Sequence, residues 1–279
     1  MLNLVFNLFA RLPLNQAHWL GAVLGRMVYR VSAPYRWKVD AQLTAAGLAQ
    51  NTQLKFHALE HTGRLLTELP WVWTQSDANL MATVCLSDSV VQVQATTQNH
   101  PTIYLTPHLG SFEVAGRAIA AMRGLTVMFK PPKIAALENI VKTARGNASM
   151  QTVPANFSGV RQLLKTLKRG EAIGLLPDQV PSDGDGVMAP FFGKDAYTMT
   201  LQAKLASSSG AHVVLVVCER LSERNASGHQ FRLHMELMAE SPEPVALNKA
   251  IESLVRRFPE QYLWGYNRFK PPKITPATI

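Results

Sequence analysis

The chain has 279 residues, of which 47% are hydrophobic and 17% charged, so it is long and apolar enough to bury a substantial core in one or two domains. Its 28 basic residues outnumber its 19 acidic ones, and the formal charge of +9 favours an anionic partner such as a membrane surface, an acidic carrier protein, a phosphorylated substrate or nucleic acid. The only cysteines, Cys85 and Cys218, indicate buried thiols in a reducing compartment and exclude a disulfide framework.

The N-terminal part of the chain carries two apolar stripes, at residues 2–12 and 19–31, the second with arginines beside it. Neither reaches the run of about 18 apolar residues that a membrane-spanning helix needs, and no signal-peptide cleavage pattern follows the first. Aromatic and basic residues beside an apolar face are typical of a segment that lies in a membrane interface. A helix facing the protein core is the alternative. We expect a helical membrane-associating region over residues 1–50.

The remainder, residues 51–279, is predicted to form an α/β domain. Apolar spacing predicts N-terminal helices over 15–32, 35–49 and 52–73. Further on, the expected strands are 102–106, 125–129, 151–153, 172–176, 212–219 and 231–235, and the expected helices are 112–122, 135–144, 157–168, 198–208 and 245–258. This alternation predicts the α/β class, with a mixed, mostly parallel central sheet flanked by helices.

A possible metal motif lies inside the third predicted helix. His57-Ala58-Leu59-Glu60-His61 matches the inverted zinc-protease pattern, in which histidines at i and i+4 share one face. No third ligand stands at a persuasive distance, and His61 lies among apolar positions that suit a buried, hydrogen-bonded histidine. We therefore expect no metal site.

The stretch from Thr102 to Glu113 combines a buried strand, a histidine and the first turn of a helix. Ligands gather at the carboxyl edge of open α/β sheets, and the histidine side chain exchanges protons near neutral pH. Because Glu113 follows His108 by five positions, its carboxylate could accept one ring N–H, fix the tautomer and leave the other nitrogen as a general base. A histidine at a strand end beside a helix-favouring glutamate is the structural alternative.

The sequence around this histidine, His-Leu-Gly-Ser-Phe-Glu, resembles the histidine–four residues–acid (HX4E) motif of glycerolipid acyltransferases. Its glycine–aromatic–glutamate variant is similar to the bacterial lipid A biosynthesis (lauroyl/myristoyl) acyltransferases. Further stretches are similar to that family in the same order: Arg145–Met150, Gly170–Gln179, Pro190–Lys194 and Trp264–Lys270. Each block alone is weak, but together they span nearly the whole chain, and they imply a glycerolipid acyltransferase-like fold.

The resemblance implies an O-acyltransferase without a cofactor. It would move a fatty acyl chain from a thioester on acyl carrier protein to a hydroxyl of a lipid A precursor, at the cytoplasmic face of the cell inner membrane, peripherally or through an N-terminal anchor. Acyl length, the acceptor hydroxyl and coenzyme A as the donor stay open. The alternatives are another lipid or alcohol acceptor and a non-catalytic membrane-associated member of the same fold. Dispersed basic residues without a reader motif argue against a nucleic-acid binder.

The expected mechanism is general-base acyl transfer. His108 removes a proton from the acceptor hydroxyl as that oxygen attacks the thioester carbonyl, and Glu113 orients and charges the imidazole. Backbone N–H groups of Gly110 and Ser111 are expected to stabilise the oxyanion. No protein nucleophile is needed, because the thioester is already activated and Ser111 lies in no Gly-x-Ser-x-Gly elbow.

Two residues outside the motif are expected to bind substrate. Arg145 falls where the resembled family places an arginine that contacts the substrate or the oxyanion. Asp178 follows a buried strand, at the same sheet edge as His108. It either supports Arg145 or holds a lipid hydroxyl, and a plain turn aspartate is the alternative.

Overall fold

A seven-stranded sheet forms the centre of the protein. The computed structural model describes the chain except for residues 1, 130–148, 222–227 and 273–279. The strands of this sheet are β1 (Val84–Leu86), β2 (Thr102–Leu105), β3 (Leu125–Phe129), β4 (Met150–Pro154), β5 (Ala172–Leu175), β8 (His212–Arg220) and β9 (Phe231–Leu237). Their order is β1-β9-β8-β2-β5-β3-β4. All neighbours are parallel except β8 and β9, so the predicted mixed, mostly parallel sheet is confirmed.

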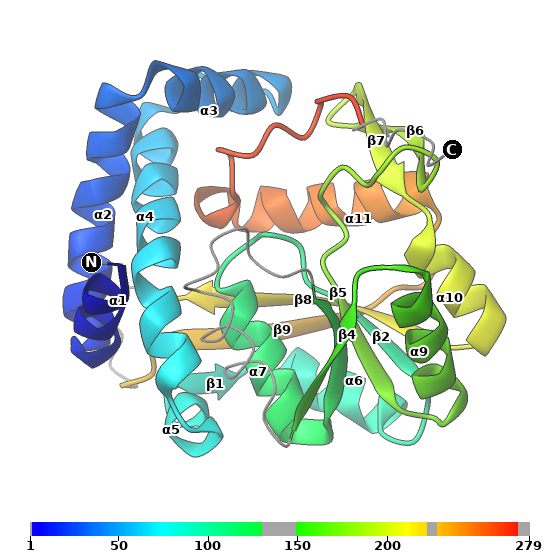
Figure 1. Cartoon of the computed structure of the whole chain (residues 1–279). Coiled ribbons are helices and arrows are strands. Elements are labelled where there is room, and N and C mark those ends of the chain that lie inside the picture. The colour runs from blue at the N-terminus through cyan, green and yellow to red at the C-terminus, as the bar shows by residue number, and fades with distance from the viewer. Residues whose placement is uncertain (1, 130–148, 222–227, 273–279) are drawn as a thin grey trace.

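Helices cover both faces of this sheet (Figure 1). They are α1 (Leu2–Arg11), α2 (Leu14–Val31), α3 (Ala33–Ala45), α4 (Thr52–Thr74), α5 (Asp77–Met81), α6 (Asp88–Thr97), α7 (Phe112–Arg123), α9 (Phe157–Lys168), α10 (Leu201–Ser209) and α11 (Pro244–Arg257), followed by the 3-10 turn η1 (Pro259–Gln261). The helix expected over 135–144 lies outside the described residues. The short elements β1, α5 and α6 were not predicted.

Two hydrophobic cores lie on opposite faces of the sheet. Along β2, Ile103 and Leu105 belong to the core that includes residues of α9, α10 and α11, whereas Tyr104 belongs to the core with α6 and α7. Successive side chains of a strand point to opposite faces. Strands covered on both faces therefore carry continuous apolar runs, which is why residues 102–105 are buried throughout.

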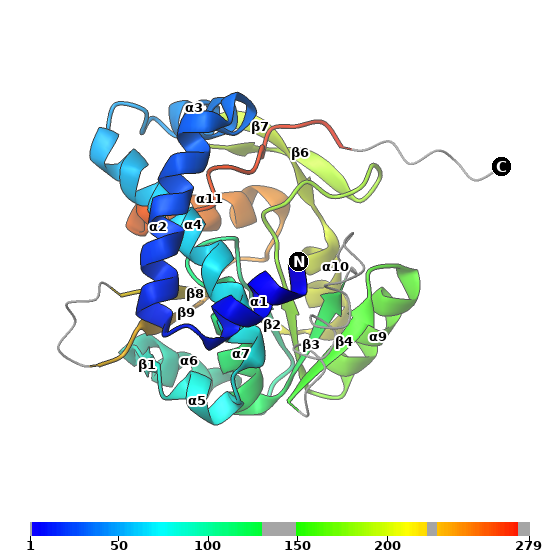
Figure 2. The same cartoon turned by 60° about the vertical axis from the view of Figure 1, so that its left-hand side comes forward.

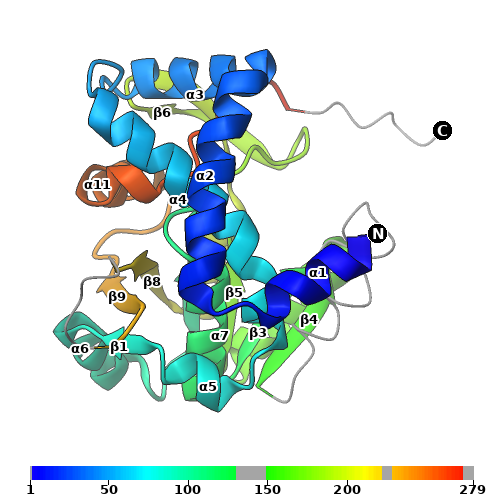
Figure 3. The ribbon, with the colours of Figure 1, turned by 90° about the vertical axis from the view of Figure 1, so that its left-hand side faces the viewer.

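The N-terminal helices form a separate flank of the molecule. α2 runs alongside α4, and α3 crosses at their ends (Figures 1 and 3). The two helix backbones touch, because a Cβ added to Gly63 would lie only 1.8 Å from the carbonyl oxygen of Gly21. α1 to α3 are thus attached to α4, the first helix of the predicted 51–279 domain. Among the helices that the structure describes, none is long and apolar enough to cross a membrane.

An antiparallel hairpin, β6 (Gly186–Phe191) and β7 (Lys194–Met199), stands at the same end of the molecule as α3 (Figure 2). The stretch Pro190–Lys194 contains its turn, which Phe192 and Gly193 form between the paired residues Phe191 and Lys194. The buried Arg268 donates to the carbonyl oxygen of Tyr197 at 2.8 Å and to Oγ1 of Thr198 at 2.7 Å. The C-terminal segment therefore holds the hairpin against the α/β core.

Candidate active site

His108 and Asp178 meet at the carboxyl edge of the sheet. They follow β2 and β5, which are adjacent and parallel, so residues 70 positions apart come together. Nδ1 of His108 lies 2.8 Å from Oδ1 of Asp178, and the backbone N–H of His108 donates to Oδ2 at 2.9 Å. Asp178 is buried, whereas the imidazole is 13% exposed. One carboxylate therefore fixes both the backbone and the ring of the histidine.

The other ring nitrogen identifies the tautomer. Nε2 of His108 lies 3.0 Å from the amide nitrogen of Gln179. An amide nitrogen only donates, so Nε2 accepts and Nδ1 carries the hydrogen that is donated to Asp178. Burial alone would raise the pKa of the Asp178 carboxyl, but the charge of His108 and its hydrogen bonds hold that pKa below its ordinary value. The protonated ring is the form whose charge lowers the pKa of Asp178, whereas the neutral ring presents a lone pair on Nε2 beside the ionised carboxylate.

The His108 turn (residues 107–111) requires glycine at position 110. Gly110 has a φ of +64°, and an added Cβ would lie 2.2 Å from the carbonyl oxygen of Cys218 in β8. The N–H of Gly110 donates to the carbonyl oxygen of Gln261 at 3.0 Å, and that of Ser111 donates to Cys218 at 2.7 Å. The two amides expected at the oxyanion thus already have acceptors inside the protein, because the turn is bonded to β8 and η1.

Glu113 lies in the first turn of α7 and is buried. Its Oε2 accepts a hydrogen bond from the indole Nε1 of Trp73 at 3.2 Å. The carboxylate on Nδ1 of His108 is that of Asp178, not that of Glu113 as the motif spacing suggested. Phe112, next to Glu113, packs its ring against the imidazole, with ring centroids 4.8 Å apart. The catalytic role of Glu113 stays a prediction.

A small apolar cavity lies between α7 and the sheet. Glu113, Phe112 and Thr106 line it together with apolar residues of β2, β3 and α7, and Gly116 and Gly174 leave it open. Its volume of about 50 Å³ is well below the roughly 300 Å³ at which ligand pockets begin. A fatty chain would therefore enter only if its walls moved apart.

Sequence reasoning did not single out Gln179 or Tyr266 as site residues. Gln179 contacts His108, and the hydroxyl of Tyr266 accepts from the backbone N–H of Val180 at 2.8 Å, which holds the segment after Asp178. Both residues belong to stretches that resemble the family, Gly170–Gln179 and Trp264–Lys270. Sequence similarity over a stretch does not identify which of its atoms contact one another. Arg145 lies outside the described residues.

The histidines of the zinc-like pattern have other surroundings. Nδ1 of His57 lies 2.9 Å from Oε1 of Glu260, and His61 is buried. The described residues contain no group of three or more histidine, cysteine or acidic side chains placed to hold a metal ion. Both cysteines are free thiols, with Cys218 buried and Cys85 partly exposed.

Comparison with known proteins decides the family. A family model described as bacterial lipid A biosynthesis acyltransferase matches residues 3–271, which include the whole site. The chain belongs to this family. The protein is therefore an O-acyltransferase of lipid A biosynthesis, as the sequence blocks indicated.

Individual relatives of this acyltransferase are moderately similar. It is 27% identical over 228 residues to a lipid A biosynthesis palmitoleoyltransferase of Escherichia coli (strain K12), covering 80% of this chain and 71% of that protein. It is 26% identical over 220 residues to the lipid A biosynthesis lauroyltransferase of the same strain, covering 75% and 68%. A lipid A biosynthesis acyltransferase of Shigella flexneri is 27% identical over 228 residues, covering 80% of this chain and 71% of that protein.

Proposed function

We propose that this acyltransferase moves a fatty acyl chain from a thioester on acyl carrier protein to a hydroxyl of a lipid A precursor, with His108 as the general base. The contact between Nδ1 of His108 and Asp178 carries the proposal. Because Nδ1 donates to the carboxylate, Nε2 has its lone pair available to take a proton.

The reaction begins when the acceptor hydroxyl replaces the Gln179 amide on Nε2 of His108. The hydroxyl proton passes to Nε2 while its oxygen attacks the thioester carbonyl, which gives a tetrahedral oxyanion. The carbon–sulfur bond then breaks, and the imidazolium returns the proton to the leaving thiolate. No residue of the protein is acylated, because holding both substrates supplies the proximity that the reaction needs.

Two carboxylates are proposed to stabilise the imidazolium that forms. Asp178 does so directly, and burial beside His108 strengthens the interaction because the local dielectric constant is low. Glu113 is proposed to add a second negative charge from the cavity. Since the Gly110 and Ser111 amides are bonded within the protein, they would serve the oxyanion only by exchanging those bonds. Arg145 remains the predicted cation for the substrate or the oxyanion.

The proposed substrates are supported by the net charge of the chain, and the proposed location by the exposed surface of α2. A net charge of +9 suits an acidic carrier protein and a phosphorylated lipid. Large apolar side chains of α2, among them Trp19 and Val31, are exposed. We infer that this face lies on the cytoplasmic side of the inner membrane as a peripheral contact, so that the site reaches its lipid acceptor from the membrane surface.

The test compares three site variants in an assay of labelled acyl transfer from acyl carrier protein to a lipid A precursor. His108→Ala is expected to abolish transfer. Asp178→Asn should lower kcat by about two to four orders of magnitude, because an amide cannot hold the same tautomer and charge. Glu113→Gln should also lower kcat strongly while circular dichroism remains that of the wild type.

The matched control is His100→Ala. His100 is exposed and lies just before the amino end of β2, whereas His108 follows its carboxyl end. This control variant should keep wild-type activity. Wild-type transfer by His108→Ala would refute the proposed base. Transfer to a glycerolipid or another alcohol in preference to the lipid A precursor would refute the proposed acceptor.

A further inference from the structure

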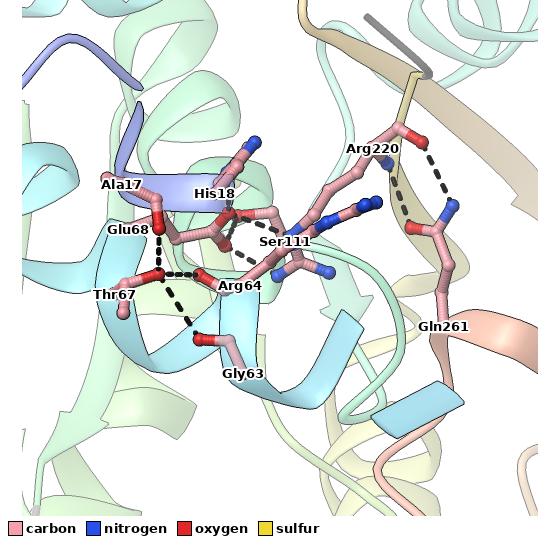
Figure 4. Close-up of polar contacts among 9 residues, drawn as sticks. All are labelled: Ala17, His18, Gly63, Arg64, Thr67, Glu68, Ser111, Arg220 and Gln261. Atoms are coloured by element: carbon pink, nitrogen blue, oxygen red, sulfur yellow. Dashed lines mark hydrogen bonds and ion pairs between the residues drawn. The ribbon is translucent and has the colours of Figure 1, made fainter. Parts of the chain in front are cut away.

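A buried cluster of charged and polar groups surrounds Glu68 and includes Ser111 of the His108 turn (Figure 4). Glu68 of α4 is fully buried, and its carboxylate accepts from Nε and Nη2 of Arg220 at 2.7 and 2.5 Å. Nε2 of His18 in α2 lies 2.8 Å from the same carboxylate. Ser111 donates its hydroxyl to Oε1 at 2.6 Å. One side chain of α4 thus joins α2, the end of β8 and the turn that carries the proposed base.

The charge at Glu68 persists despite its burial. Burial would raise the pKa of this carboxyl, but the charge and hydrogen bonds of Arg220, with those of His18, lower its pKa to about 2. A buried ion pair is a poor source of stability, because well-packed apolar side chains would stabilise the fold at least as well. Its hydrogen-bonding geometry, in contrast, is highly directional. The cluster is therefore better explained by what it orients than by the free energy of folding.

The hydrogen bonding of the Ser111 side chain indicates that the cluster orients the start of α7. Ser111 is the N-cap residue of α7, yet within the described part of the chain its side chain caps no amide of that helix. A serine at this position normally accepts a hydrogen bond from an amide of the first helical turn. Asn51 and Asn156 do so at the starts of α4 and α9. The hydroxyl of Ser111 is instead turned toward Glu68.

The backbone of Arg220 is linked through Gln261 to Gly110, the residue before Ser111 in the His108 turn. Its N–H donates to Oε1 of Gln261 at 2.9 Å, and its carbonyl oxygen accepts from Nε2 of Gln261 at 3.0 Å. The carbonyl oxygen of Gln261 in turn accepts from the N–H of Gly110 at 3.0 Å. Gly110 and Ser111 are thus both bonded, directly or through Gln261, to the Glu68–Arg220 pair.

We propose that Glu68 is a positioning residue for acyl transfer: through the Ser111 hydroxyl it fixes the turn between His108 and Phe112. This inference rests on the proposed function, because it concerns the alignment of His108 as the base. Small displacements of a base from its substrate lower the rate of the chemical step and leave binding largely intact. Loss of the Ser111 hydroxyl should therefore lower kcat and leave the KM values unchanged.

The decisive variant is Ser111→Ala, which removes one hydroxyl and leaves Glu68 paired with Arg220 and His18. We expect kcat to fall by about tenfold or more, with the donor and acceptor KM values close to those of the wild type. The matched control is Thr67→Val. Thr67 is the buried neighbour of Glu68 in α4, but its hydroxyl bonds to the carbonyl oxygens of Ala17 and Gly63. This control should lower the melting temperature and keep kcat.

A double-mutant cycle tests the pairing itself. Glu68→Leu leaves Arg220 buried without a carboxylate, so that variant can fail to fold, in which case Ser111→Ala decides alone. If Glu68→Leu folds, adding Ser111→Ala should not lower kcat further, because leucine offers no acceptor and both changes break the same hydrogen bond. Multiplicative losses of kcat would overturn the proposed coupling.

Other outcomes are equally decisive. Wild-type kcat in Ser111→Ala, or equal losses of kcat in Ser111→Ala and Thr67→Val, would show that the cluster is only structural. Acyl transfer by the wild type and by His108→Ala tests the proposed function independently of the positioning role. If the wild type transfers acyl chains and His108→Ala does not, an unaffected Ser111→Ala refutes the positioning role alone. If the wild type transfers none, the proposed function fails and the positioning role fails with it.

Discussion

Burial sets the ionisation state of His61, whereas charged partners outweigh burial at Asp178 and Glu68. His61 lies in α4, and burial, with the positive charges of Arg220 and Arg64, lowers its pKa to about 2, although Glu68 opposes that shift. Its Nδ1 has no hydrogen-bond partner among the described residues. The expected buried histidine is confirmed, but the hydrogen bond that was expected to satisfy it is not seen for this atom.

Folding stability should therefore depend on pH through His61. In the unfolded chain this imidazole takes up a proton below about pH 6.5, whereas the folded chain keeps it neutral. Its contribution is present above about pH 6.5, and the free energy of unfolding falls by up to about 1.4 kcal/mol per pH unit below that value. Urea unfolding between about pH 6.5 and 4.5 measures the slope. His61→Leu should flatten it and His100→Leu should not; equal slopes in both variants would contradict the assignment.

Among the elements, α2 presents two unlike faces. Gly21 and Gly25 are buried against α4, where an added Cβ at either would lie within 2.4 Å of atoms of that helix. The other face exposes Trp19 to 64% and Val31 to 74%, with Val23 and Met27 between them at intervals of four residues. This spacing forms one stripe along the helix. The small residues of α2 thus pack against α4, and its large apolar residues face outward.

The outward stripe of α2 should bind lipid. We expect the double substitution Trp19→Gln and Met27→Gln to weaken partitioning into anionic vesicles by at least tenfold, because each large apolar side chain contributes about 1.5–3 kcal/mol when fully buried. Vesicle sedimentation measures the effect. The matched control is Val91→Gln on α6, a side chain that is 62% exposed and lies outside this stripe. Equal binding by the double variant and the control would exclude α2 as the membrane contact.

The molecule as a whole carries a charge of +9, which bears on its donor. If an acidic carrier protein delivers the acyl chain, long-range attraction contributes to the encounter, and salt screens that attraction over about 10 Å at 0.1 M. The KM for acyl carrier protein should therefore rise as salt is raised from about 50 to 500 mM. Steady-state kinetics with a neutral acyl-pantetheine thioester provides the control. A KM that responds to salt equally for both donors would argue against carrier-protein recognition by charge.

Local sequence determined the elements and the family of this protein. The strands that precede His108 and Asp178 are short, uninterrupted apolar runs between turns, and the lack of polar alternation indicates burial on both faces of a sheet. The hairpin of β6 and β7 and the short elements β1, α5 and α6 were not predicted, because none of them is buried along its whole length as β2 and β5 are. Gly110 is required both by its own φ of +64° and by the carbonyl oxygen of Cys218, which lies 2.2 Å from where a Cβ would be.

Only the tertiary structure decided which side chains meet. Motif spacing paired His108 with Glu113, five residues away, but the order of the strands places β5 beside β2 and brings Asp178 to the imidazole across 70 residues. Glu68 reaches Ser111 from a helix that precedes the sheet. Apolar periodicity states that a residue is buried, whereas the partner of a buried polar group depends on strand order and helix docking. Those are properties of the packed chain, because they arise from contacts between segments that are distant in sequence.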